Sequence, residues 1–202
     1  MKTKLLLALL ASLISTALFA ADSPPVGSAA PDFSVTDSKG KTQSVSQYKG
    51  KTVVLEWFNP ECPFVKKHYG SGNMQKLQEE FTGKDVVWLT IDSSAPGKQG
   101  HLTAEEANQI ITKLKMKSTA LVLDADGKTG QTYGAKNTPH MFVINPEGKI
   151  VYEGAIDSRN STNAADIPSA TNYVKVALEE SLAGKSVSNA ITQPYGCSVK
   201  YK

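Results

Sequence analysis

The stretch TVVLEWFNPECPFV, residues 52–65, joins an almost continuous apolar run to a turn that carries a cysteine. A run of this kind is typical of a β-strand that is buried on both faces, and Glu56 is its one charged member. Pro63 suits the first turn of a helix, where its missing N–H would have no partner in any case. The stretch therefore predicts a buried strand, a turn, and a helix that begins directly after Cys62.

Downstream of this stretch, helical and strand patterns alternate. Apolar residues at helical spacing predict helices over 64–69 and 74–81, with a Gly-Ser-Gly break between them. Thr103 and Glu106 form a capping box at the start of a further helix. The remaining predicted elements are a strand at 86–91, a helix at 103–115, a strand at 120–123, a short helix at 128–133, a hairpin of strands at 141–144 and 150–154, and a closing helix at 169–183.

Two of these elements carry further expectations. The closing helix is expected to place one set of apolar residues on a single face: Tyr173, Val174, Ala177, Leu178 and Leu182. Upstream of the central strand, short alternating runs at 33–35 and 43–45 flank turn residues at 37–40 and predict an N-terminal hairpin.

The first thirty residues read as a targeting segment and a leader. Two lysines precede an uncharged apolar run over residues 5–19 that ends in two alanines. This is the pattern of a secretory signal peptide, so residues 1–20 are expected to be removed on export to the periplasm or the cell exterior, with an uncleaved anchor as the alternative. Residues 21–30 are rich in Pro, Gly, Ser and Ala and are expected to form a flexible leader.

The rest of the chain has an ordinary globular composition, with 40% hydrophobic and 20% charged residues. One domain is expected over 31–185, followed by a C-terminal tail over 186–202 that carries Cys197. Without residues 1–20 the chain has 20 basic and 19 acidic residues. Because no basic stripe is present, nucleic acid and membrane surfaces are not expected as partners.

The order of strands and helices around a cysteine turn resembles the thioredoxin pattern. The sequences APDF (30–33), DSKGK (37–41) and YKGKTVVL (48–55) resemble the opening of redoxins, the alkyl hydroperoxide reductase and thiol-specific antioxidant group of thioredoxin-like proteins. TPHMFVI (138–144) resembles the cis-proline loop of this group. The resemblance spans roughly residues 30–183. It implies an α/β, thioredoxin-like fold: a central mixed β-sheet flanked by helices, with the N-terminal β-hairpin as an extension.

The resemblance also implies roles for individual residues. Cys62 matches the family's nucleophilic cysteine, Pro139 the cis-proline that faces it, and Glu56 a buried carboxylate that assists proton transfer. The neighbouring residues expected to bind substrate are Thr138, His140, Pro63 and Phe64.

The motif departs from two patterns of related proteins. Val65 stands where a Cys-x-x-Cys motif has its second cysteine, so it cannot resolve a mixed disulfide. Leu55 and Asn59 stand where peroxiredoxins have a Pro and a Thr or Ser that position the peroxide.

Cys62 is predicted to be a reactive thiol, because a helix N-terminus favours the thiolate. Lys66 and Lys67 act in the same direction, and the adjacent Glu61 acts against it. The alternative is a buried, unreactive cysteine.

Cys197 is the second of the two cysteines and lies in the tail sequence YGCS, residues 195–198. If the tail folds over the active-site turn, Cys197 can resolve a disulfide on Cys62. A redox-active pair, a permanent structural bridge and no pairing all stay open. A bridge would close a loop of about 135 residues and stabilise the fold by about 5 kcal/mol at most in the chain-entropy model.

Three other titratable residues carry expectations. Burial is expected to raise the pKa of Glu56, with a position open to water as the alternative. His140 is expected either to reach the Cys62 turn or to lie at the surface, and His68 to be a polar surface residue. Cys62, Cys197 and His140 would be the ligands if the chain handled copper.

The sequence thus predicts an exported thiol-dependent oxidoreductase that needs no organic cofactor or metal. The Cys62 thiolate attacks a disulfide, and Cys197 or an external thiol resolves the product. Expected partners are protein or small-molecule thiols and disulfides, hydroperoxides, and an external thiol reductant. The alternatives are a thiol-dependent peroxidase with Cys62 as the peroxidatic residue, and a redox-inert thioredoxin-fold module that binds a partner or handles copper.

Overall fold

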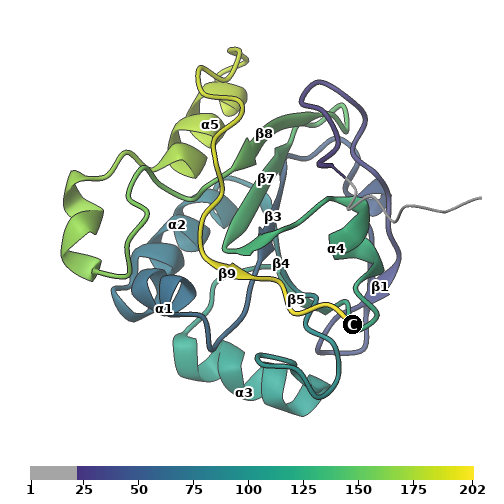
Figure 1. Cartoon of the computed structure of the whole chain (residues 1–202). Helices are drawn as coiled ribbons and strands as arrows, with labels where there is room; N and C mark the ends of the chain where they lie inside the picture. Colours follow the sequence, from purple (N-terminus) through teal and green to yellow (C-terminus); the bar gives the residue numbers. More distant parts are fainter. Residues whose placement is uncertain (1–21) are drawn as a thin grey trace, which may run out of the picture.

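A central five-stranded mixed sheet organises the chain, in a computed structural model that describes residues 22–202 (Figure 1). The strand order is β5-β4-β3-β7-β8. β3 pairs in parallel with β4, and β4 with β5, whereas β7 is antiparallel to both β3 and β8. The strands are β3 (Val53–Trp57), β4 (Val87–Asp92), β5 (Ala120–Leu123), β7 (His140–Ile144) and β8 (Ile150–Gly154).

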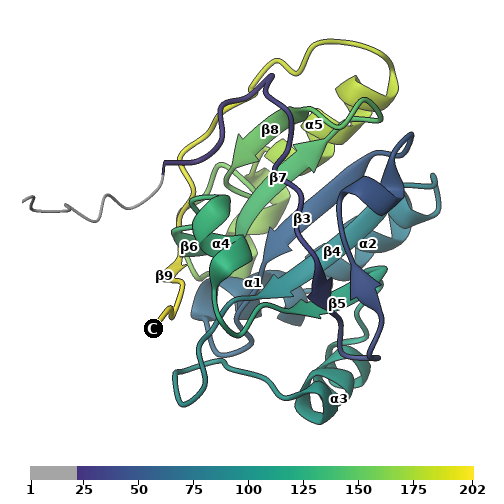
Figure 2. The same cartoon turned by 90° about the vertical axis from the view of Figure 1, so that its right-hand side faces the viewer.

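Helices cover both faces of this sheet and bury two apolar clusters. One cluster lies beneath α1 (Pro63–Gly70), α2 (Asn73–Thr82), α3 (Ala104–Leu114) and α5 (Tyr173–Leu182). The other lies beneath α4 (Lys128–Thr132) and the N-terminal segment with η1 (Ser46–Tyr48) and the antiparallel hairpin β1 (Val35–Thr36) and β2 (Thr42–Gln43), as Figure 2 shows. The thioredoxin-like α/β fold with an N-terminal hairpin is confirmed.

The helix boundaries follow local sequence signals. The Thr103 side chain and Glu106 form the expected capping box at the start of α3. The closing helix, however, begins at Tyr173 rather than Ser169, because residues 164–169 form the 3-10 helix η2 (Ala164–Ser169) with Pro168 inside it. Leu182 was expected on the buried face but is 44% exposed at the end of α5.

The leader does not behave as expected over residues 27–30. Gly27 N–H donates to Ile150 O (2.7 Å), and Ala30 N–H donates to Gly148 O (2.9 Å). These bonds hold residues 27–30 against the start of β8, so this part of the leader is fixed to the sheet rather than flexible. The expected signal peptide, residues 1–20, lies outside the described residues.

The C-terminal tail crosses the end of the sheet, where it is drawn in yellow in Figure 1. Its strand β9 (Cys197–Ser198) pairs antiparallel with β6 (Asn137–Thr138), and Thr138 lies opposite Cys197. Tail and cis-proline loop are therefore joined by backbone pairing. Within residues 22–202 no helix is long and apolar enough to span a membrane.

Candidate active site

Cys62 lies at the N-terminus of α1, directly after the turn that follows β3. It is the N-cap residue, and Pro63 occupies the first helical position, as the sequence predicts. The side chain is fully buried, and its Sγ donates to the carbonyl oxygen of Thr138 at 3.1 Å. The Thr138–Pro139 peptide bond is cis. The fold thus brings the predicted nucleophile and the predicted cis-proline loop into contact.

The second thiol of the chain lies at the same place. Cys197 and Cys62 are both free, and the fold places them side by side: Cys62 bonds to Thr138 O, Thr138 lies opposite Cys197 in the β6–β9 pair, and Cys197 packs against the apolar cluster that contains Cys62. Burial by itself raises the pKa of Cys62, but the neighbouring Cys197, Thr138 and the Val65 N–H of the first helical turn together outweigh it, so the pKa is lowered. Burial and the neighbouring Cys62 raise the pKa of Cys197 to about 11. Cys62 is therefore the thiol that ionises first.

Three glycines allow the tail and the domain to approach each other closely. A Cβ on Gly196 would lie 2.1 Å from Thr138 O, and one on Gly154 would lie 2.3 Å from Thr192 O. At the far end, a Cβ on Gly130 would lie 2.3 Å from the hydroxyl of Tyr201. Such distances are far below van der Waals contact, so a larger residue at these positions would have to displace the atom it meets: backbone at Gly154 and Gly196, and the end of the Tyr201 side chain at Gly130.

Aromatic residues fix the tail on both sides of Cys197. The Tyr195 ring packs edge-on against Phe64 of α1, with centroids 5.7 Å apart. The Tyr201 hydroxyl donates to Ala135 O at 2.8 Å. Phe64 is half-buried beneath the tail, whereas Pro63 is exposed beside it. Of the residues expected to bind substrate, Phe64 and Thr138 thus contact the tail.

Glu56 is fully buried in the middle of β3, so the alternative of a position open to water is wrong. Its carboxylate accepts four hydrogen bonds, from Tyr69 Oη (2.8 Å), Gln78 Nε2 (3.1 Å), Trp88 Nε1 (2.8 Å) and Thr90 Oγ1 (3.2 Å). Burial raises its pKa although all four bonds oppose the shift. Its hydrogen-bond partners in the described chain include neither Cys62 nor Cys197.

His140 lies at neither of its two expected places. It is 1% exposed, and its ring packs on Phe142 and Trp57, with centroids 4.7 and 6.5 Å away. These two residues belong to the apolar cluster beneath α4, whereas Cys62 belongs to the cluster on the opposite face of the sheet. Burial lowers the pKa of His140 to about 3, so the ring is neutral. This placement does not support a substrate-binding role.

The same geometry removes the copper ligand set. His140 is separated from the two thiols by the sheet, and among residues 22–202 no three His, Cys, Asp or Glu side chains are grouped as a metal site. The copper-handling alternative therefore has no ligand cluster in the described part of the chain.

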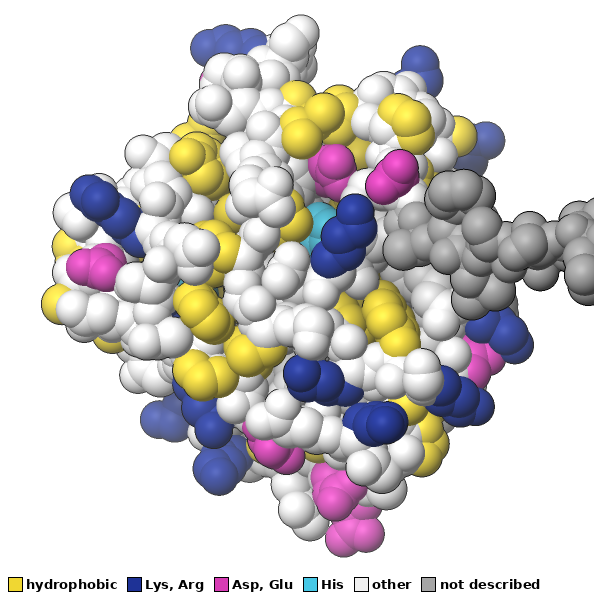
Figure 3. Space-filling model, in the orientation of Figure 1, with side chains coloured by type: hydrophobic (Ala, Val, Ile, Leu, Met, Phe, Trp, Pro, Cys, Tyr) yellow, Lys and Arg dark blue, Asp and Glu magenta, His cyan; other side chains and the backbone are white. Residues whose placement is uncertain are grey.

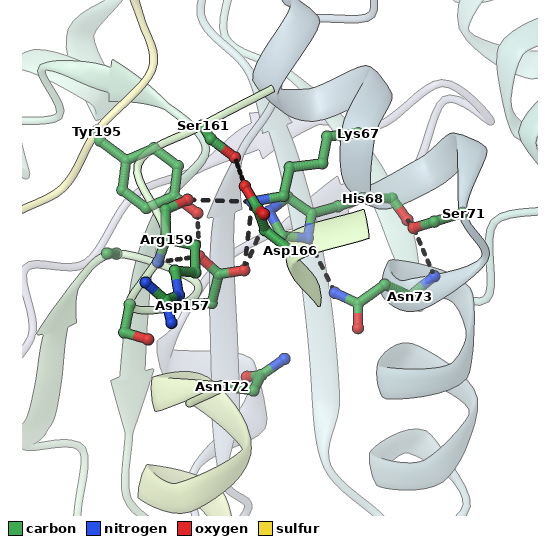
Figure 4. Close-up of polar contacts among 12 residues, drawn as sticks. Lys67, His68, Ser71, Asn73, Asp157, Arg159, Ser161, Asp166, Asn172 and Tyr195 are labelled. Atoms are coloured by element: carbon green, nitrogen blue, oxygen red, sulfur yellow. Dashed lines mark hydrogen bonds and ion pairs between the residues drawn. The ribbon is translucent and has the colours of Figure 1, made fainter. Parts of the chain in front are cut away.

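A buried polar cluster behind α1 is not evident from the sequence (Figure 4). His68, expected at the surface, is fully buried, and Lys67 is 4% exposed. Lys67 Nζ lies 3.6 Å and His68 Nε2 3.8 Å from Asp157 Oδ2. Lys67 therefore faces Asp157 rather than acting as a free cation for Cys62. One sequence signal was present: His68 follows the buried Val65 by three positions, which places it on the same helix face.

The face that carries the tail has separate apolar patches and scattered charges (Figure 3). Lys and Arg side chains do not form a continuous stripe over the described residues on this face. The surface therefore offers no extended basic track beside the thiol pair.

Comparisons with known proteins identify the family of the chain. The model of the Redoxin family matches residues 25–174. Thiol-disulfide oxidoreductase ResA of Bacillus subtilis is 30% identical over 154 residues, which cover 74% of this chain and 80% of that protein. ResA of Geobacillus kaustophilus is 27% identical over the same length, covering 74% and 83%.

Solved structures resemble the whole described fold. A hypothetical protein of Sinorhizobium meliloti aligns with a TM-score of 0.75 and 22% identity, covering 89% of this chain and 96% of that one. An uncharacterized conserved protein of Geobacillus kaustophilus aligns with a TM-score of 0.74 and 24% identity, covering 88% and 93%. At these identities the likeness establishes the fold alone. On the family match and the ResA relatives, the chain belongs to the redoxin family.

Proposed function

We propose that this redoxin is a thiol-disulfide oxidoreductase in which Cys62 is the nucleophile and Cys197 is the resolving thiol. The observation that carries the proposal is the placement of Cys197 beside Cys62, through the Cys62–Thr138 hydrogen bond and the pairing of Thr138 with Cys197. The lowered pKa of Cys62 and the raised pKa of Cys197 support the two roles. The ResA relatives, named as thiol-disulfide oxidoreductases, support the reaction class.

The reaction runs in two exchange steps. The Cys62 thiolate attacks one sulfur of a substrate disulfide, a Cys62–substrate disulfide forms, and the other substrate sulfur leaves as a thiolate. Cys197 then gives up its proton and attacks the Cys62 sulfur, and the second substrate sulfur leaves. The substrate has gained two electrons, and the protein holds a Cys62–Cys197 disulfide. An external thiol reductant returns it to the dithiol.

The groove for the substrate would lie between α1 and the cis-proline loop. Pro63 and Phe64 form its α1 side, and Thr138 and Pro139 form the other side. Because Thr138 O accepts from the Cys62 thiol, the same carbonyl ties the nucleophile to the loop before attack. Glu56 takes part in neither exchange step, since its hydrogen bonds go to side chains other than the two cysteines.

Export is part of the proposal. The apolar run over residues 5–19, preceded by two lysines, supports action in the periplasm or outside the cell. Disulfides persist in those compartments, so a disulfide substrate would be present there.

Trapping of the intermediate tests the roles of the two cysteines. Cys197→Ser is mixed with a disulfide substrate such as oxidised glutathione, and products are resolved by mass spectrometry. We expect the variant to accumulate a stable Cys62–glutathione disulfide, whereas the parent protein passes on to the Cys62–Cys197 disulfide. Cys62→Ser is the matched control and should form no intramolecular bridge.

Two outcomes contradict the proposal. Equal accumulation of the mixed disulfide in parent and Cys197→Ser would show that Cys197 does not resolve it. A bridge that persists at the most reducing glutathione ratios would show a structural disulfide instead. The peroxidase alternative gains no support from the site, because Asn59 is engaged with Gln99 O and Glu61 N–H in the turn.

A further inference from the structure

The cluster around Asp157 joins the helix that begins at Cys62 to the tail that carries Cys197. Lys67 lies on α1, Asp157 follows β8, and Tyr195 lies in the tail. The side chains of Lys67 and Asp157 are 0% and 2% exposed. A buried lysine and aspartate are costly to remove from water unless they are paired. Lys67 and Asp157 therefore depend on contacts with each other and with neighbouring polar groups.

The two carboxylate oxygens of Asp157 contact side chains from different elements. Oδ1 accepts a hydrogen bond from the Tyr195 hydroxyl, and Oδ2 faces Lys67 Nζ and His68 Nε2. Lys67 Nζ also donates to Arg159 O at 3.0 Å and lies 5.9 Å from the centre of the Tyr195 ring. Figure 4 shows these groups converging from α1, from the segment after β8 and from the tail.

Tyr195 is two residues before Cys197, so fixing one places the other. The chain between them passes Gly196, whose φ of 130° and close approach to Thr138 O leave little freedom. Cys62 has 0% exposure with the tail in place. A substrate sulfur therefore reaches Cys62 only after this part of the tail has moved away.

We propose that Tyr195 and Asp157 are positioning residues, which hold Cys197 against Cys62 and keep Cys62 covered until a substrate displaces the tail. This rests on the proposed function, because it gives Cys197 the resolving role. Lys67 holds the Asp157 carboxylate in place, and the hydrogen bond between Tyr195 and Asp157 breaks when the tail opens. The substrate class that fits is a disulfide that can enter along β6 once β9 has left.

The test compares Tyr195→Phe with the parent protein in two assays. Phenylalanine keeps the ring that packs on Phe64 and removes only the hydroxyl bonded to Asp157. In the fully reduced protein, we expect iodoacetamide to alkylate Cys62 roughly tenfold faster in the variant, since a hydrogen bond to a charged group is lost only from the closed tail. Starting from the Cys62–glutathione disulfide, closure to the Cys62–Cys197 bridge should instead be severalfold slower.

Tyr173→Phe is the matched control. Tyr173 lines the same cavity of about 260 Å³ as Asp157 and Tyr195. Its hydroxyl makes no hydrogen bond within residues 22–202, so both rates should stay at the parent values.

Amide hydrogen exchange separates tail opening from general loosening. We expect faster exchange in Tyr195→Phe at residues 197–199 and unchanged exchange at Leu55 in the centre of β3. Equal alkylation rates in parent and variant, or an equal rise of exchange at Leu55, would overturn the positioning role. If alkylation accelerates but no bridge ever forms from the glutathione disulfide in either protein, the resolving role of Cys197 fails while the covering role of Tyr195 stands.

Discussion

At the scale of single residues, the proposed chemistry depends on an asymmetry between the pKa values of two thiols. The protonated Cys62 donates to Thr138 O, and the neighbouring Cys197 thiol is the main group that lowers the pKa of Cys62. A donor aimed at a thiolate stabilises the charged form, and a thiolate beside a thiol opposes the second ionisation. One proton is therefore lost readily and the other is retained, which is the arrangement that a nucleophile and a resolving thiol require.

Two substitutions at position 197 test this asymmetry. Cys197→Ala removes the donor to Cys62, whereas Cys197→Ser keeps a hydroxyl donor at the same place. We expect the pKa of Cys62 to be higher in the Ala variant than in the Ser variant. The measurement is thiolate absorbance near 240 nm against pH, in which each variant has one thiol. Coincident titration curves would show that the tail residue does not stabilise the thiolate.

Glu56 makes a second prediction at this scale. Because burial raises its folded-state pKa, the native protein keeps a proton that the unfolded chain loses above its ordinary value of 4.5. The contribution of Glu56 to stability is thus greatest below pH 4.5 and is lost as pH rises to the folded pKa, with a slope of at most about 1.4 kcal/mol per pH unit. Glu56→Gln should remove this loss while keeping its acceptor oxygen for Trp88. Urea unfolding of both proteins between pH 4 and 8 measures it, and parallel curves would contradict the prediction.

At the scale of elements, the tail behaves as part of the domain. Val199 N–H donates to Lys136 O at 3.1 Å, and Ala95 N–H donates to Lys200 O at 2.8 Å, on either side of the tail's path. With β6 and β9 paired as well, the tail is bonded to two separate loops around the thiol pair. Its position is set by tertiary contacts rather than by any regular structure of its own.

The glycine at position 130 tests how closely the tail end is fitted. A Cβ there would lie 2.3 Å from Tyr201 Oη and 2.9 Å from Ser93 Oγ. We expect Gly130→Ala to cost about 1–3 kcal/mol of unfolding free energy, as overpacking does. Gly70→Ala in α1 is the control, since its Cβ would meet nothing within 4 Å and alanine favours a helix. Equal urea midpoints for the two variants would show that Tyr201 moves aside at no cost.

At the scale of the whole molecule, the two thiols connect distant parts of the chain. Cys62 follows the central strand β3, and Cys197 comes after α5, near the C-terminus. A bond between them constrains nearly the entire domain when it unfolds. On the proposed function, oxidation of the pair would therefore change global stability as well as take part in turnover.

The oxidised protein should resist urea more than the reduced protein. The chain-entropy model gives a stabilisation of up to about 5 kcal/mol for a loop of about 135 residues, and strain in the native state reduces it. Unfolding of the parent protein with and without dithiothreitol measures the difference. Cys197→Ser should show no dependence on dithiothreitol, and an equal dependence in both proteins would contradict the assignment of the bridge.

The sequence by itself determined the order of elements, since periods of apolar residues report which faces are buried. It also placed Cys62 at a helix N-terminus and Glu56 in a buried strand, because these are local properties of residues 52–65. The family resemblance added the cis peptide bond before Pro139, which the structure contains.

Only the tertiary structure decided where the tail lies. Residues 186–202 have no periodicity, so their path depends on non-local pairing with β6 and on space left by glycines far away in the sequence. The same holds for the two buried histidines. His68 faces Asp157, which is distant in the sequence. His140 packs on Phe142 of the same strand, and the local sequence does not show which face of that strand is apolar. Local sequence specifies which elements form, whereas the partners of buried polar groups and of an irregular tail are fixed only when those elements pack.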